Sequence, residues 1–131
     1  MLTSNTINGM LDVLNGYLTN ITLVEDASET LSLDDNLGVS DSKICGYTNS
    51  GNNGIGISWN TASGGSKALD TSADNTPIMF AVPSGKTPTH IVFLNASRTI
   101  RGIDKLDTPI THTNDGPFYM YAYNIEMEES V

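Results

Sequence analysis

The chain has 131 residues, a formal net charge of −9 and a pI of about 4.3. This length predicts a single domain, residues 1–131, with one hydrophobic core. An acidic chain repels phosphate backbones and anionic headgroups, so we expect neither a nucleic acid nor a membrane as a partner. Only 16% of the residues are charged and 38% are hydrophobic; Ser, Thr, Asn and Gly make up the difference. Such residues are typical of short strands joined by many turns.

The first expected element is one amphipathic helix at the N-terminus, over about residues 6–18. Its apolar stripe recurs at helical spacing and consists of Ile7, Met10, Leu11, Leu14 and Leu18. Such a helix usually packs on its own domain, but the stripe is also a candidate surface for docking a partner protein. No basic segment or long apolar run marks the first residues, so we expect no signal peptide, and no stretch reaches the length of a membrane-spanning helix.

About eight short strands are expected after the helix, from about residue 19 to residue 127. The ranges are 19–24, 55–59, 78–82, 89–94, 99–103, 109–113 and 118–127, with 43–47 and 67–69 as weaker candidates. Residues 25–42 are acidic and are expected to form a long loop or a ragged edge hairpin. The range 89–94 is the most apolar and is expected at the centre of a sheet. Turn signals roughly every eight to twelve residues, without alternating helices, predict a mainly β fold: an antiparallel, jelly-roll-like β-sandwich.

The clearest pattern is a period-two alternation in the closing range 118–127. Tyr119, Tyr121 and Tyr123 fall on one face of an extended strand. A tyrosine row is amphipathic and suits a wet binding face or a protein interface. Together with Trp59 it is a candidate platform for sugars. In the favoured alternative the row packs in the core or at a subunit interface, and each hydroxyl reaches the edge of the core.

Several polar residues are candidate ligands for a metal ion. His90, His112 and Asp115 have the right chemistry, but they lack a tight ligand spacing. The segments 34–36 and 70–75 carry the oxygen ligands that calcium prefers, yet Asp and Asn are also the residues that ordinary turns use. We therefore expect no metal ion and no other cofactor.

The chain also lacks the familiar catalytic motifs. No Gly-x-Ser-x-Gly elbow, phosphate-binding loop, dinucleotide fingerprint or His-Glu-x-x-His sequence occurs. Cys45 is the only cysteine, so no intrachain disulfide forms, and we expect a buried thiol. Carboxylates are plentiful but no pair is singled out, so an enzyme with a carboxylate pair is only a third hypothesis. We expect no catalytic residue.

Two stretches carry a resemblance to a known family. Residues 58–66 read Ser-Trp-Asn-Thr-Ala-Ser-Gly-Gly-Ser, and residues 79–91 read Met-Phe-Ala-Val-Pro-Ser-Gly-Lys-Thr-Pro-Thr-His-Ile. A glycine at 102, a Thr-Pro-Ile strand start at 108–110 and an opening helix before an Asn-Ile-Thr-Leu strand follow the same outline. In these features the chain resembles small virion proteins of tailed bacteriophages, commonly labelled tail-fibre-like or minor structural proteins.

The resemblance implies a non-enzymatic virion structural protein that is made in the host cytoplasm. It would be an accessory module on the capsid surface, as a decoration or cement protein, or on the tail. The implied partners are capsid or tail proteins of the same virion and further copies of the chain, as a homo-oligomer or in many copies per particle. The alternative is a carbohydrate-binding module for host surface glycans. The candidate interface residues are Ile7, Met10, Leu11, Leu14, Trp59, Tyr119, Tyr121 and Tyr123.

Overall fold

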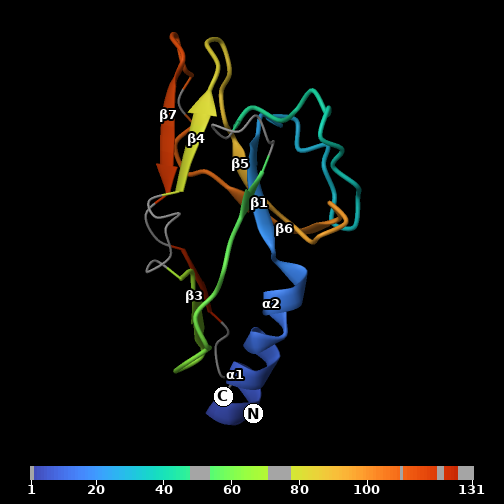
Figure 1. Cartoon of the computed structure of the whole chain (residues 1–131), viewed down its shortest axis with the longest axis vertical. Coiled ribbons are helices and arrows are strands. Elements are labelled where there is room, and N and C mark those ends of the chain that lie inside the picture. The colour runs from blue at the N-terminus through green and yellow to red at the C-terminus, as the bar shows by residue number, and fades with distance from the viewer. Residues whose placement is uncertain (1, 48–53, 71–77, 110, 121–122, 127–131) are drawn as a thin grey trace.

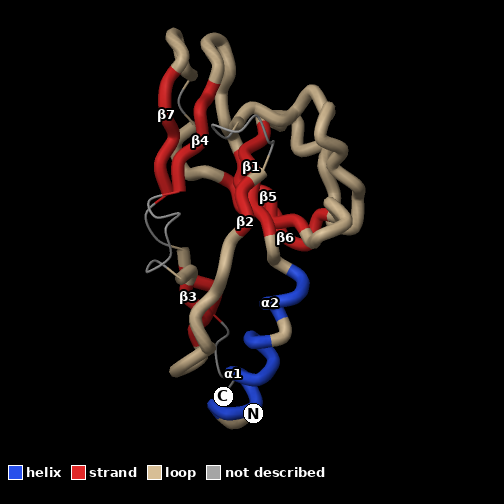
Figure 2. Tube along the Cα trace, in the orientation of Figure 1, coloured by secondary structure: helices blue, strands red, loops and turns tan. Residues whose placement is uncertain are grey.

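The structure is a computed structural model that describes residues 2–47, 54–70, 78–109, 111–120 and 123–126 (Figure 1). In these ranges two helices, α1 (Ser4–Asp12) and α2 (Leu14–Tyr17), precede eight strands that form three antiparallel sheets (Figure 2). The strands are β1 (Asn20–Val24), β2 (Ile55–Gly56), β3 (Ser66–Ala68), β4 (Ile78–Val82), β5 (His90–Leu94), β6 (Ile100–Lys105), β7 (Gly116–Met120) and β8 (Asn124–Glu126). The predicted mainly β class with an N-terminal helix and antiparallel sheets is confirmed.

The largest sheet has the strand order β2-β1-β5-β6. Strands β1 and β5 pair antiparallel, from Asn20 opposite Leu94 to Val24 opposite His90. Every residue of β5 is buried, as expected for an apolar run with strands on both sides. The prediction that range 89–94 occupies the centre of a sheet is therefore confirmed.

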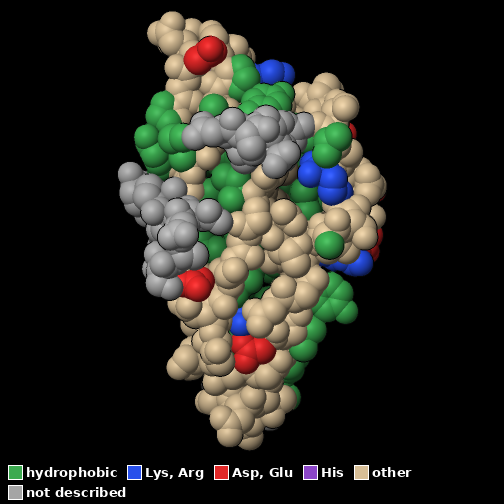
Figure 3. Space-filling model, viewed as in Figure 1, with side chains coloured by type: hydrophobic (Ala, Val, Ile, Leu, Met, Phe, Trp, Pro, Cys, Tyr) green, Lys and Arg blue, Asp and Glu red, His purple; other side chains and the backbone are tan. Residues whose placement is uncertain are grey.

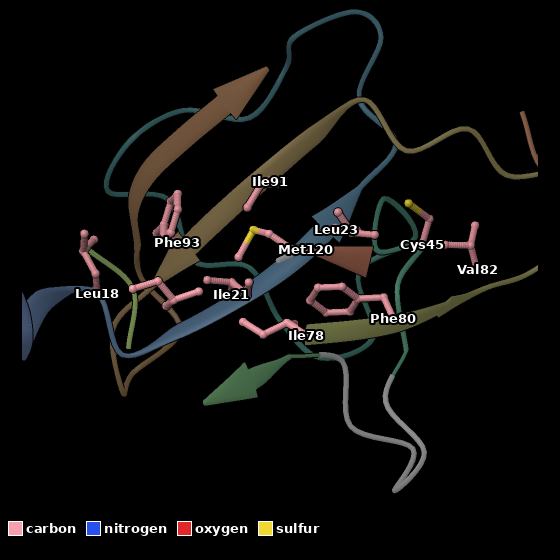
Figure 4. Packing of buried hydrophobic residues seen from close by; sticks show 11 residues of the cluster. Leu18, Ile21, Leu23, Cys45, Ile78, Phe80, Val82, Ile91, Phe93 and Met120 are labelled. Carbon is pink, nitrogen blue, oxygen red and sulfur yellow. The ribbon is translucent and has the colours of Figure 1, made fainter. Parts of the chain in front are cut away.

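This sheet is covered on both of its faces. One face packs against β4 and β7, and Figure 4 shows the side chains that meet there: Ile21, Leu23, Ile91 and Phe93 from the sheet, with Ile78, Phe80, Val82 and Met120 opposite. The other face carries a second buried cluster of Val24, Leu37, Ile44, Val92, Leu94 and Ile100. Leu37 comes from the acidic range 25–42 and Ile44 from just after it, so this range covers part of a sheet face as an irregular loop. The two-layer packing agrees with a sandwich, and the jelly-roll-like topology stays a prediction.

The helical region begins earlier than expected and is less continuous. Helix α1 begins at Ser4, and the hydroxyl of its N-cap residue Thr3 accepts a hydrogen bond from the Thr6 N–H at 3.2 Å. The predicted single helix over 6–18 is interrupted at Val13, and one further turn, α2, follows it. Neither helix in the described ranges has the length and apolar character needed to cross a bilayer.

The expected single strand over 118–127 is wrong in the part that is described. Strand β7 pairs with β4, whereas β8 pairs with β3, in a separate two-stranded sheet. The alternation is present in each piece, but the segment changes its pairing partner between Met120 and Asn124. In Figure 1, β3 lies near the helices and β4 lies at the other end of the molecule.

Three other predicted strands differ from the structure. Range 55–59 shortens to β2, and Trp59 makes only an isolated bridge to Leu69. Range 43–47 has isolated bridges at Ile44 and Tyr47 instead of a strand. The described residues of range 109–113 form no strand. In the first two of these ranges apolar residues lie in or against the core without forming a full strand, so apolar content alone overstated the strand content.

Candidate protein interface

The inner side of α1 is buried against its own chain. Ile7 is 1% exposed and Leu11 3% exposed, and both pack with Ala62 in a small core cluster. Leu14 is partly buried and packs against the same cluster. Three of the four helix residues predicted as candidate interface therefore contribute to packing inside this chain.

Polar contacts fix the helix to the segment that leads into β3. The Asn8 Oδ1 atom accepts a hydrogen bond from the Gly65 N–H at 3.0 Å. The Asp12 Oδ1 atom accepts from the Ala62 N–H at 2.8 Å and from the Lys67 Nζ ammonium at 2.5 Å. The Lys67 side chain is fully buried in this pair. The hydrogen bonds from Lys67 and Ala62 hold the pKa of Asp12 below its usual value, so this carboxylate is ionised at neutral pH.

The outer side of the helical region is apolar and exposed. Met10 is 46%, Val13 58% and Tyr17 47% exposed. Their spacing of three and four residues places them on adjacent turns of one face. The Arg101 guanidinium carbon lies 5.6 Å from the centroid of the Tyr17 ring, a cation–π contact. We call Met10, Val13 and Tyr17 the helix patch, and Figure 3 shows hydrophobic side chains along this helical end of the molecule.

Only Met10 of the helix patch was among the predicted interface residues. Val13 and Tyr17 were missed because the sequence stripe was centred on Leu11 and Leu14. The signal that would have found them is their spacing from Met10, at three and seven residues, which forms a second apolar ridge beside the first.

Trp59 and Tyr123 lie in an aromatic cluster with Phe93. The Trp59 ring centroid is 6.1 Å from that of Phe93 and 6.4 Å from that of Tyr123, and the Phe93 and Tyr123 centroids are 5.0 Å apart. The Trp59 indole N–H donates to the Leu18 carbonyl oxygen at 2.9 Å. The Trp59 indole thus makes internal contacts through its ring and its N–H group, which suits packing better than a sugar platform.

Tyr123 combines a packed ring with a hydrogen-bonded hydroxyl. Its O–H donates to the Asp104 Oδ2 atom at 2.6 Å. Burial and this hydrogen bond to a carboxylate raise the pKa of Tyr123 well above its usual value. This is the arrangement of the favoured alternative, in which the ring packs and the hydroxyl reaches the edge of the core.

The tyrosine row is not continuous in the described residues. Tyr119 is 46% exposed on β7, while Tyr123 directly precedes β8, which belongs to another sheet. Tyr121 lies outside the described residues. The structure therefore brings Trp59 and Tyr123 together and places Tyr119 on a different strand.

The histidines have separate surroundings. His90 is buried; its Nδ1 atom is 2.7 Å from the Thr89 hydroxyl, and its Nε2 atom is 3.7 Å from a Glu29 carboxylate oxygen that also pairs with Lys105 at 3.1 Å. Across the described ranges, no group of three or more His, Cys, Asp or Glu side chains is arranged to hold a metal ion.

Comparisons with known proteins found no matching family model, no matching curated protein and no matching solved structure. Function must therefore be inferred from the residues and contacts of this chain.

Proposed function

We propose that this chain is a non-enzymatic structural protein of a bacteriophage virion. It acts as an accessory module attached to the capsid surface, as a decoration or cement protein, or to the tail. The residue patterns at 58–66 and 79–91 support the phage assignment. The mainly β architecture agrees with it, and the helix patch supplies a surface for protein–protein contact.

The helix patch is the observation that carries this proposal. Three large apolar side chains, each about half exposed, lie together on one face of the helical region. Contiguous apolar surface that remains in water favours association, because burying it releases hydration water. Asp12 and Asn8 hold the opposite side of the same helix in place. A surface fixed in this way loses little conformational entropy when a partner binds.

A small patch is sufficient for a particle component that is present in many copies. Each contact can be weak, because neighbouring copies on a particle raise the effective concentration of one another. The helix patch belongs to the helical end of the molecule, whereas β4 and β7 lie at the other end in Figure 1. Docking through the helix patch therefore leaves β4 and β7 uncovered. The glycan platform predicted as the alternative receives less support, because Trp59 and Tyr123 are engaged in internal contacts.

The first test is made on virions of a phage that encodes this chain. Mass spectrometry of purified particles is expected to find it, and particles lacking it are expected to fail in one of two ways. Rupture under osmotic shock identifies a cement protein, whereas intact particles that do not adsorb to the host identify a tail protein. Absence of the chain from purified particles would overturn the proposal.

The second test addresses the helix patch itself. A Met10→Ser, Val13→Ser, Tyr17→Ser variant is compared with a Leu33→Ser, Val39→Ser control, which removes two other apolar side chains that are 59% and 56% exposed. Binding to particles that lack the protein is measured by co-sedimentation, after circular dichroism has shown that both variants are folded. We expect the control to bind as the unaltered chain does and the helix-patch variant to bind at least about tenfold more weakly. Equal binding of both variants would exclude the helix patch as the contact surface.

A further inference from the structure

A pocket of about 300 Å³ opens beside β7, at the end of the molecule away from the helices. Its described walls are mostly apolar and include Pro88, Leu106, Pro117 and Phe118, with three side chains that can form hydrogen bonds, Thr108, His112 and Tyr119. This volume is at the lower end of the range for small-molecule sites, and a mainly apolar wall with few polar groups is typical of them. It accommodates one ring with a small substituent.

His112 is the polar group whose chemistry restricts the ligand. Its main chain is anchored on both sides: its N–H donates to the Lys86 carbonyl oxygen at 2.9 Å, and its carbonyl oxygen accepts from the Gly85 N–H at 2.6 Å. The imidazole lies close to Gly116, where a Cβ atom would be 3.3 Å from the His112 Cδ2 atom. The ring is therefore held in place at the pocket.

One ring nitrogen of His112 is buried without a partner. Nδ1 is shielded from solvent and has no hydrogen-bond partner in the described part of the chain, and Nε2 is the other nitrogen of a side chain that lines the pocket. A buried N–H without an acceptor costs more free energy than a bare lone pair, so the neutral ring carries its proton on Nε2. His112 thus offers an N–H donor at Nε2, and the matching ligand group is an acceptor oxygen.

The charge of the site restricts the ligand further. Among the described residues that line the pocket there is no acid, lysine or arginine, and the whole chain has a net charge of −9. An anionic ligand would be repelled by the chain, and neither an anion nor a cation would find a counter-charge among these side chains. The lining therefore suits a neutral ligand with an apolar portion, a ring face that can lie against the exposed Tyr119 ring, and an acceptor oxygen for His112.

We propose that this pocket binds an N-acetylhexosamine unit. The acetamido carbonyl oxygen accepts the hydrogen bond from His112 Nε2, the acetamido methyl group lies against the proline and phenylalanine wall, and one face of the sugar ring stacks on Tyr119. The proposal goes beyond the virion role and does not depend on the helix patch, because the two surfaces use different residues at different ends of the molecule.

The test uses ¹⁵N–¹H NMR spectra of the whole chain titrated with N-acetylglucosamine and N-acetylgalactosamine. Glucose, which lacks the acetamide, and acetamide, which lacks the ring, are the matched ligands. We expect either acetamido sugar to shift signals from residues 106–119, with a dissociation constant at least about tenfold lower than that of glucose or acetamide. Absence of shifts, equal shifts with glucose, or tighter binding of an N-acetylated lysine peptide would overturn the proposal.

Two variants locate the binding contacts. His112→Phe keeps a flat ring and removes the donor, and Tyr119→Ala removes the stacking wall; each is expected to weaken sugar binding about tenfold or more. Tyr17→Ala is the matched comparison, because Tyr17 and Tyr119 are 47% and 46% exposed. Tyr17→Ala is expected to weaken particle binding and keep sugar binding, and Tyr119→Ala the reverse. Sugar binding that survives both pocket variants would place the sugar elsewhere and refute the proposal.

Discussion

Gly46 lies where the two layers of the main core leave no room for a side chain. A Cβ atom at this position would be 2.9 Å from the Leu23 Cβ atom and 3.0 Å from the Phe80 Cδ1 atom. Leu23 belongs to β1 and Phe80 to β4, and they are 0% and 1% exposed, so neither side chain can turn into solvent. Overpacking of a dense core costs about 1–3 kcal/mol, and the lower entropy of an unfolded alanine chain offsets about 0.4–1 kcal/mol of it. Gly46→Ala is therefore expected to lower the free energy of unfolding by about 1–2 kcal/mol.

Gly9→Ala is the matched control for this substitution. Gly9 lies in α1, is exposed, and has no atom within 4 Å of the position of an added Cβ. Alanine in a helix is favoured over glycine by about 0.5–1 kcal/mol, so this variant is expected to be more stable than the unaltered chain. Urea denaturation followed by the fluorescence of Trp59, the only tryptophan, measures both changes. If Gly46→Ala matched or exceeded the stability of the unaltered chain while Gly9→Ala behaved as expected, β1 and β4 would not pack across residue 46.

Three further experiments test buried side chains. Burial raises the pKa of the Cys45 thiol to about 12, so at pH 8 Ellman's reagent is expected to react with this thiol far more slowly in the folded chain than in urea. Equal reaction rates in the two conditions would show an accessible thiol. The raised pKa of Tyr123 means that folding favours its neutral form. The resulting stabilisation is complete below about pH 10 and is lost as the pH rises further. Because phenylalanine does not ionise, Tyr123→Phe is expected to flatten the decline of the urea midpoint above about pH 10. Asp12→Ala leaves the Lys67 ammonium buried without its carboxylate, whereas Lys67→Met leaves only a partly exposed carboxylate. Asp12→Ala is therefore expected to lower the urea midpoint more than Lys67→Met does. The opposite order would contradict the buried ion pair.

The strands of the main sheet were predictable because their signal is local. Range 89–94 ends in a run of four apolar residues, range 19–24 alternates with Ile21 and Leu23 on one face, and the structure has β5 and β1 there. A strand covered on both faces needs apolar residues at successive positions, and few other local structures use such a run of this length. The partner of a strand is not local information, however. The closing segment alternates as predicted, yet β7 and β8 belong to different sheets.

The candidate surfaces were less predictable, because an amphipathic pattern does not say which apolar side chain is left uncovered. Met10 and Leu11 are neighbours in one stripe, but Leu11 is buried and Met10 is 46% exposed. Lys67 gives the opposite case. A lysine in a strand is expected in solvent, and its complete burial depends on Asp12, which is 55 residues away in the sequence.

One of the two stretches on which the proposed phage assignment rests, residues 58–66, also contacts the helical region. Within residues 58–66, the Trp59 indole donates to the Leu18 carbonyl oxygen, the Ala62 N–H donates to Asp12, and the Gly65 N–H donates to Asn8. All three hydrogen bonds join this segment to the helical region or to the residue that follows it. Two of the donors, at residues 62 and 65, are main-chain N–H groups. These two hydrogen bonds therefore depend on the path of the backbone and not on which side chains stand at 62 and 65. The segment 58–66 and the exposed apolar face are thus parts of one structural unit, in which the segment holds the inner side of the helical region and leaves Met10, Val13 and Tyr17 on its outer side.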